Sequence, residues 1–188
     1  EWDETFLVNL SGLQTNGRIV GLGDAQAVIT IHDNDQAAIS INDATIDEDA
    51  GSVSITVSLD HPIDTSISVD YATADQAATS ANDYTTTTGT LIFSPGDQLQ
   101  TIVIPITDTD LVEWDEIFLV NLSGLQTNGR NVELGDTQAV ITIHDDDQAA
   151  ISINDISISE DVGTAMVTVT LDLPVSQTIS VNYALNDL

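Results

Sequence analysis

The stretch that decides the fold is VITIHDDD at residues 140–147, which is followed almost at once by the apolar run AISI at 150–153. An earlier copy, VITIHDND, occupies residues 28–35 and leads into AISI at 38–41. Strict alternation of apolar and polar residues predicts β-strands on both sides of each acidic run. Two like charges about 4 Å apart repel by about 4 kcal/mol at an effective dielectric constant of about 20. The chain has only 2 Lys and Arg residues against 31 Asp and Glu, so we expect the missing cation to come from outside.

The chain repeats itself. Residues 113–188 match residues 1–76 at an offset of 112, with 53 identities in 76 aligned positions. A period of this length is typical of an array of domains rather than of a short-unit solenoid. We therefore expect a complete repeat at 37–147, between the C-terminal part of a repeat at 1–36 and the N-terminal part of another at 148–188.

Partial sandwiches expose apolar faces and open strand edges, which promotes aggregation. We expect that the chain is a window on a longer array, or that neighbouring chains complete the partial repeats.

Composition excludes several classes of partner. The formal net charge is −29 over 188 residues, and 41% of the residues are hydrophobic. Nucleic acids and anionic membrane surfaces attract Lys and Arg, so neither is an expected partner. No apolar run approaches the roughly 20 residues that a membrane span requires. The chain has no Cys, which excludes disulfides and thiolate metal sites.

Alternating runs predict seven strands in the complete repeat and no helix. They lie at about 38–46, 53–59, 67–71, 90–93, 102–106, 115–123 and 138–144, with loops at 75–88 and 124–136. The side chains expected in the core are Val53, Ile55, Val57, Leu59, Ile67, Val69, Tyr71, Ile102, Ile104, Ile106, Phe118, Val120 and Leu122. Seven short strands in about 110 residues predict an all-β fold, a Greek-key β-sandwich in each tandem repeat.

Antiparallel order would bring the acids to one end of this sandwich. The ends of the odd-numbered strands and the starts of the even-numbered ones share that end, and the acids found there are Glu48, Asp75, Asp108, Asp110, Glu113, Glu116, Asp145, Asp146 and Asp147. We call this the acidic end. The candidates in the partial repeats are Glu1, Glu4, Asp33, Asp35, Glu160 and Asp187. Because the next repeat begins directly after residue 147, we expect the acidic end to face it.

Carboxylates converging in this way suit Ca²⁺, which takes six to eight oxygen ligands. The alternative is a solvated acidic surface that only keeps an extracellular protein soluble. His32 and His144 adjoin the acidic runs but are expected to face solvent, since Ca²⁺ prefers oxygen. Trp2 and Trp114 are expected to pack over the acidic end.

Six motifs together carry a family resemblance. They are EDAG at 48–51, YATAD at 71–75, NDY at 82–84, GTLIF at 89–93, EWDEIF at 113–118 and IHDDD at 143–147. With them the chain resembles one full and two partial Calx-beta domains. The resemblance implies an immunoglobulin-like sandwich that binds several Ca²⁺ ions at its strand-end loops. The implied ligands are Glu48, Asp75, Asp108, Glu113, Glu116 and Asp145 to Asp147.

Two departures from the family pattern remove negative charge: Thr109 separates Asp108 from Asp110, and Asn34 stands in the middle of the first acidic run. The family occurs in sodium–calcium exchangers, integrin subunits and bacterial surface proteins, and near-identical tandem copies resemble the last group most. The resemblance therefore implies an extracellular, cell-surface location, in a bacterium.

Three hypotheses for function remain open. The first is a Ca²⁺-binding structural or adhesive repeat in a long cell-surface or matrix protein, in which Ca²⁺ stiffens the joints and fibres can form. Its partners would be neighbouring repeats, in cis or between chains, and a cell-surface or matrix ligand. The second is a regulatory Ca²⁺ sensor of a membrane transporter, and the third is an acidic module that needs only general salt screening. An enzyme is not expected, because the acids crowd one end without a cleft-forming insertion or a nucleophile on a special turn.

Overall fold

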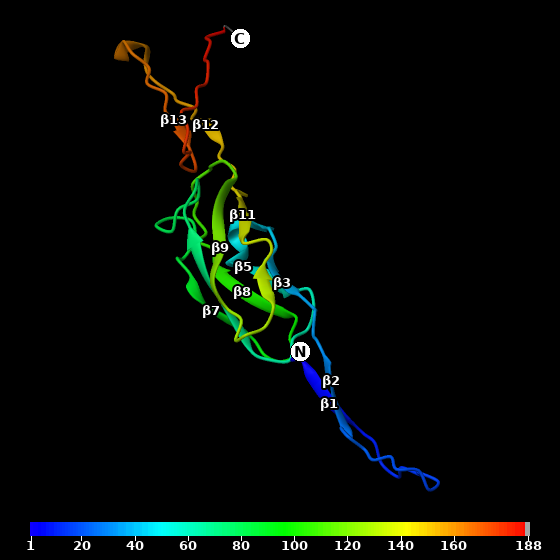
Figure 1. Cartoon of the computed structure of the whole chain (residues 1–188). Helices are drawn as coiled ribbons and strands as arrows, with labels where there is room; N and C mark the ends of the chain where they lie inside the picture. The colour runs from blue at the N-terminus through cyan, green and yellow to red at the C-terminus, as the bar shows by residue number, and fades with distance from the viewer. Residues whose placement is uncertain (187–188) are drawn as a thin grey trace.

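The computed structural model describes residues 1–186 as an elongated molecule with a β-sandwich in the middle and a two-stranded hairpin at each end (Figure 1). The N-terminal hairpin pairs β1 (Glu4–Asn9) with β2 (Gln26–Ile31), and the C-terminal one pairs β12 (Ile151–Ile153) with β13 (Val169–Leu171). Among the described residues, no helix has the length and apolar character that crossing a bilayer requires.

Two sheets form the sandwich. The first has the order β10-β3-β5-β8 and consists of β3 (Ala37–Ile41), β5 (Ser52–Leu59), β8 (Leu99–Pro105) and β10 (Val132–Leu134). The second has the order β4-β11-β9-β6-β7 and consists of β4 (Ala44–Asp47), β6 (Ile67–Ala74), β7 (Thr88–Phe93), β9 (Glu116–Gln126) and β11 (Gln138–His144). The predicted all-β sandwich is confirmed.

The core lies between the two sheets and follows the alternation of the sequence. Every side chain predicted to face inward is buried except Tyr71, which is partly buried. Tyr84, a core residue outside the predicted strands, lies in the 75–88 loop but is almost fully buried. Its ring stacks on Phe118, with 4.0 Å between the ring centroids. A loop residue thus completes the core beneath the acidic end.

The first predicted strand, at 38–46, is divided between the two sheets. Its first half, β3, pairs antiparallel with β5, and its second half, β4, pairs parallel with β11. At the crossing the Asp43 carboxylate accepts a hydrogen bond from Val140 N–H at 2.7 Å. The expected 124–136 loop also differs, since β9 runs on to Gln126 and β10 pairs parallel with β3. Both differences arise from pairing between distant segments, which alternation does not report.

Strand directions bring several chain segments to the same end of the sandwich. The pairs β5–β8, β6–β7, β6–β9 and β9–β11 are all antiparallel. Because β4 and β11 are parallel neighbours, with Asp47 opposite His144, both strands end at the same end of the sandwich. After β4 it enters the single-turn helix η1 (Glu48–Ala50), which ends at Gly51 in the left-handed region, with φ at 75°. The glycine permits that reversal into β5.

Candidate metal centre

The first acid cluster consists of Glu48, Asp145 and Asp147. Glu48 opens η1 directly after β4, and the two aspartates follow β11, so the parallel pairing of these strands brings the three together. One ligand atom from each residue lies within 4.8 Å of those of the other two. Glu48 is unusual among acids because it is 7% exposed. An ionised carboxylate with so little water around it needs a positive partner.

The electrostatics of this cluster oppose ionisation. Burial raises the pKa of Glu48, and the charges of Asp145 and Asp108 raise it further, although Thr109 N–H donates to Glu48 Oε1 at 2.8 Å. Burial of its carboxylate also raises the pKa of Asp147, and Asp145 is the strongest of the neighbouring charges that add to the shift. A bound cation would reverse each of these effects.

Two oxygens in the cluster lack a partner. Asp145 Oδ1 and Asp147 Oδ2 are shielded from solvent, and neither has a hydrogen-bond partner among the described residues. Leaving a buried polar atom unpaired costs about 1–3 kcal/mol. Native structures rarely contain such atoms without an ion or water to satisfy them. These two oxygens are therefore well placed to be metal ligands.

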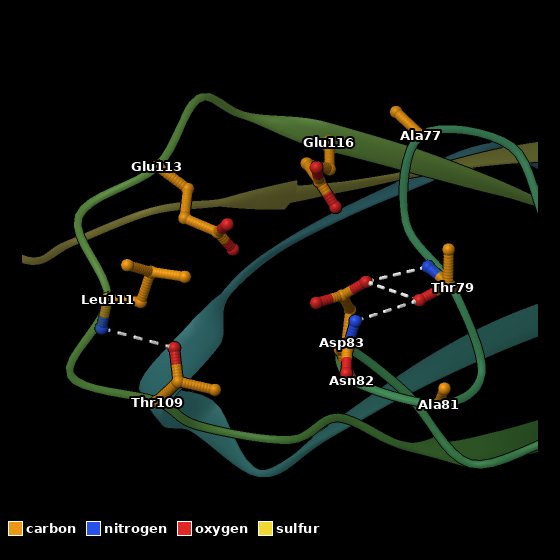
Figure 2. Close-up of a pocket in the computed structure, with 9 residues that line it drawn as sticks. All are labelled: Ala77, Thr79, Ala81, Asn82, Asp83, Thr109, Leu111, Glu113 and Glu116. Atoms are coloured by element: carbon orange, nitrogen blue, oxygen red, sulfur yellow. Dashed lines mark hydrogen bonds between the residues drawn. The ribbon is translucent and has the colours of Figure 1, made fainter. Parts of the chain in front are cut away.

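The second acid cluster consists of Asp83, Glu113 and Glu116, whose ligand atoms also lie within 4.8 Å of one another. Figure 2 shows the three side chains turned toward one space between the loop that follows β6 and the β8–β9 connection. Burial raises the pKa of both glutamates, and the charge of Asp83 is the largest electrostatic cause in each case. Thr79 holds the Asp83 carboxylate in place, since the Thr79 N–H donates a hydrogen bond to Asp83 Oδ2 at 2.6 Å.

The two clusters act on each other. The charge of Asp145 contributes to the raised pKa of Glu113, and that of Glu48 contributes to the raised pKa of Glu116. A cleft of about 430 Å³ opens beside the second cluster and gives solvent access to it (Figure 2). Together the clusters form one acidic surface with room for more than one ion.

Asp75, a predicted ligand, lies outside both clusters. Its Oδ1 accepts hydrogen bonds from the Tyr84 hydroxyl at 2.6 Å and from Ser80 N–H at 2.8 Å. The bond from Tyr84 is the main reason why the pKa of Asp75 is lowered. Burial, together with the same bond, raises the pKa of Tyr84 to about 12. Asp75 therefore ties the 75–88 loop to the core, and only its other oxygen remains for a ligand role.

Three further predicted acids, Asp108, Asp110 and Asp146, are exposed and stand around the first cluster. All three contribute negative charge that raises the pKa of Asp147. They belong to neither group of converging ligand atoms.

Asp83 is the acid that sequence reasoning missed. It lies inside the 75–88 loop, of which only Asp75, at the end of a predicted strand, was a predicted ligand. The motif NDY at 82–84 contained the signal, because a buried tyrosine next to an aspartate holds that loop over the acidic end.

The candidates in the partial repeats do not converge among the described residues. Glu1, Glu4 and Asp35 are exposed, and so is Glu160 at the start of η2 (Glu160–Val162). Asp33 is partly exposed and belongs to neither group of converging ligand atoms. Asp187 lies outside the described residues. The physical reason is that each cluster joins two distant segments. The first needs the segments after β4 and β11, and the second needs the 75–88 loop and the start of β9. The N-terminal partial repeat has no counterpart of β4 or of Asp83, and the C-terminal one has none of β9 or β11.

The donor set of both clusters fits a hard cation. Every ligand atom is a carboxylate oxygen, and the backbone carbonyls of the surrounding loops could complete a shell. Ca²⁺ accepts such irregular, oxygen-only surroundings, whereas Mg²⁺ demands a near-ideal octahedron. The chain's two arginines are Arg18 and Arg130. Among the described residues, neither forms an ion pair with a member of either cluster, and Arg130 pairs with Asp64 instead.

Comparisons with protein families and with individual proteins were both informative about this chain's relatives. The Calx-beta domain matches residues 32–147 and again residues 148–188. Mouse (Mus musculus) sodium/calcium exchanger 1 is 36% identical over 120 residues, a match that covers 55% of this chain and 12% of the exchanger. Rat (Rattus norvegicus) sodium/calcium exchanger 3 is 33% identical over 122 residues, which cover 54% of this chain and 13% of the exchanger. The chain thus corresponds to a small part of these relatives.

Solved structures agree with the sequence comparison. The apo-form Calx CBD1 domain superimposes with a TM-score of 0.55 at 28% identity, covering 60% of this chain and 100% of that domain. The calcium binding domain CBD12 of CALX1.1 gives a TM-score of 0.52 at 27% identity, covering 60% of this chain and 45% of that one.

Proposed function

Because the chain belongs to the Calx-beta domain family, we propose that it binds Ca²⁺ at the two acid clusters of its central repeat. The observation that carries this proposal is the pair of shielded oxygens, Asp145 Oδ1 and Asp147 Oδ2, which have no hydrogen-bond partner beside a buried Glu48. Solved relatives described as calcium binding domains support the same conclusion. The role is binding rather than catalysis.

Each acid would have a distinct part in holding the ion. Ca²⁺ supplies the positive charge that the clusters lack. Glu48, held by the Thr109 N–H at 2.8 Å, provides a preoriented ligand from η1. Asp145 and Asp147 provide ligands from the segment that leaves β11, so that the exit of the chain is tied to the β4 edge. Asp83, held by Thr79, brings the 75–88 loop to the second site.

We further propose that this binding makes the chain a structural or adhesive repeat of a long extracellular protein. The ligands Asp145 and Asp147 lie in the segment that joins the central repeat to β12. Without Ca²⁺, repulsion among the acids would loosen this joint, and with Ca²⁺ neighbouring repeats would keep one orientation. Near-identical copies at an offset of 112 support an array, in a bacterial cell-surface protein whose further ligand is a cell-surface or matrix component.

A second candidate is a regulatory Ca²⁺ sensor of a membrane transporter. It is favoured by the 36% identity to part of a sodium/calcium exchanger. The two roles differ in affinity, since sensors bind Ca²⁺ with Kd values of about 10⁻⁷–10⁻⁵ M and extracellular modules at about 10⁻⁴–10⁻³ M. A third candidate, an acidic module that responds only to ionic strength, would bind no particular cation.

The decisive experiment is thermal unfolding of the chelator-treated chain, followed by titration with CaCl₂, MgCl₂ and NaCl at matched ionic strength. We expect Ca²⁺ alone to raise the melting temperature strongly, because ligand binding stabilises by RT ln(1 + [L]/Kd). Equal rises with all three salts would disprove the metal sites and favour charge screening. Isothermal titration calorimetry then separates the structural repeat from the sensor by the measured Kd.

A further inference from the structure

Trp2, which precedes β1, lies on a loop of the central repeat. The Arg130 guanidinium carbon is 4.0 Å from the centroid of the Trp2 ring. The ring edge also lies so close to Gly129 that a Cβ there would stand 3.1 Å from Trp2 Cη2. Gly129 has a φ of 86°, so a side chain at this position is disfavoured both by the backbone and by the indole.

The loop that receives Trp2 is built independently of it. We call residues 128–131 the joint loop. Arg130 is buried, with Nε 2.6 Å from Asp64 Oδ1, and its Nη2 donates to Asp64 Oδ2 at 2.6 Å. Asn128 Nδ2 donates to the Ser66 carbonyl at 2.7 Å. The ion pair and the Nη2 hydrogen bond to the same carboxylate hold the guanidinium, so its face is presented in a set direction.

A second contact joins the same two parts of the chain. Asn131 Nδ2 donates to the Asp35 carbonyl at 3.2 Å, next to the acidic run that follows β2. The joint loop thus touches the segment before β1 and the segment after β2. Two contacts at separate points restrict rotation as well as distance.

Trp114 is the residue that corresponds to Trp2 at the offset of 112, and it is 75% exposed. Just before it, Val112 N–H donates to the Pro174 carbonyl at 3.1 Å, and Ser176 N–H donates to the Val112 carbonyl at 3.0 Å. Residues 174–176 correspond to 62–64, the segment that holds Arg130 through Asp64. Val112 of the central repeat therefore contacts the segment beside which the joint loop of a following repeat would lie.

We infer that Trp2 and the joint loop form the contact that orients one repeat on the next, and that Trp114 binds the corresponding Asn-Gly-Arg loop of a following repeat. The inference rests on the array organisation proposed above. Its Trp2 half does not rest on Ca²⁺, since neither Trp2 nor the joint loop belongs to the acid clusters, whereas Trp114 lines a small cavity with Glu48, Glu113 and Asp145. The interaction combines a cation–π contact with close packing over glycine.

The first test compares Trp2→Leu with Trp114→Leu in the full chain by NMR, with chelator and again with Ca²⁺. We expect an upfield ring-current shift of the Gly129 α-protons that Trp2→Leu abolishes and Trp114→Leu leaves unchanged. Residual dipolar couplings should show residues 4–31 sharing the alignment of the sandwich, and Trp2→Leu should reduce those couplings. Both tryptophans are exposed, so the amide spectrum of the sandwich serves as a check that each variant remains folded.

If Trp2→Leu leaves the Gly129 shift and the couplings of the hairpin unchanged in both conditions, the inference is overturned. Loss of alignment in both conditions supports a contact that is independent of Ca²⁺. Such a result would stand even if the thermal melts showed no specific response to Ca²⁺, so the two proposals can fail separately.

The second test extends the full chain with a further copy of residues 77–147, which continues the repeat in register after residue 188. Because Ser176 stands where Asp64 anchors Arg130, the extended chain also carries Ser176→Asp. We expect the Trp114 indole to lose accessibility to acrylamide in this chain. Changing the appended counterpart of Arg130 to Ala should restore it, whereas Arg18→Ala, the exposed counterpart in the N-terminal hairpin, should not. Unchanged accessibility on extension would overturn the assignment of Trp114.

Discussion

The N-terminal hairpin and the β9–β11 part of the central repeat have nearly the same sequence but very different surroundings. Residues 1–40 and 113–152 are identical at 35 of 40 positions. Phe118 in β9 is fully buried, whereas its counterpart Phe6 in β1 is 50% exposed. The strands themselves form in both places, since β1 pairs with β2 as β9 pairs with β11. Alternation is thus enough for a hairpin, but burial depends on the opposite sheet.

The acidic runs differ in the same way. Asp145 and Asp147 converge with Glu48 because β4 lies beside β11. Asp33 and Asp35, at the corresponding positions after β2, form no such group among the described residues. An acidic triplet is therefore only part of a site, and the strand next to it decides whether its carboxylates converge.

The largest expected difference is in the core. Phe118→Ala should lower the free energy of unfolding of the sandwich by about 3–5 kcal/mol, because it leaves a cavity beneath Tyr84. Phe6→Ala removes the same atoms from an exposed hairpin and should change that free energy by no more than about 0.5 kcal/mol. Urea unfolding of the full chain, followed by tryptophan fluorescence and circular dichroism, measures both. Equal losses would mean that the hairpin is part of the cooperative unit and that its exposed faces are covered in solution.

The next largest effect concerns the metal site. Asp145→Asn should remove most of the Ca²⁺-dependent stabilisation, which is about 2.7 kcal/mol at a hundredfold excess over Kd. Without Ca²⁺ the same variant should be slightly more stable than the parent, because one of the repelling charges of the first acid cluster is gone. Melting temperatures measured with chelator and with Ca²⁺ test both the expected gain without the ion and the expected loss with it.

Asp33→Asn is the matched control for Asp145→Asn, since it makes the same change at the corresponding position of the other acidic run. It should leave the response to Ca²⁺ intact. An equal loss in both variants would show that Asp33 also contributes ligands, and the contrast between the two runs would then be wrong.

The same contrast separates what sequence can predict from what it cannot. Alternation correctly predicted the inward face of β5, β8 and β9, because burial there follows a local period of two. Strand direction predicted the end at which Glu48 and Asp145 meet. The division of the first strand between two sheets, and the approach of Asp83 to Glu116, depend on pairing between distant segments. For the same reason, the acids of the partial repeats that match these ligands at the offset of 112 do not converge among the described residues.

The smallest expected effect is the pH dependence of the free protein. In the first cluster the pKa of Glu48 is raised, so the folded chain binds more protons than the unfolded one just above the ordinary carboxyl range near pH 4. Stability without Ca²⁺ should therefore rise by a few degrees in melting temperature as the pH falls from 7 toward about 5. Below about pH 4 it should fall, because the pKa of Asp75 is lowered and its bond from Tyr84 weakens on protonation.

Ca²⁺ should reverse the upper part of this profile, because protons compete with the ion for the same carboxylates. Glu48→Gln should flatten the rise between pH 7 and 5 in chelator, while Glu160→Gln, the exposed counterpart in η2, should leave it unchanged. The acidity of the whole chain offers another cause for such a rise, and this pair of variants distinguishes the two. An identical slope in both variants would assign the effect to overall charge rather than to the first acid cluster.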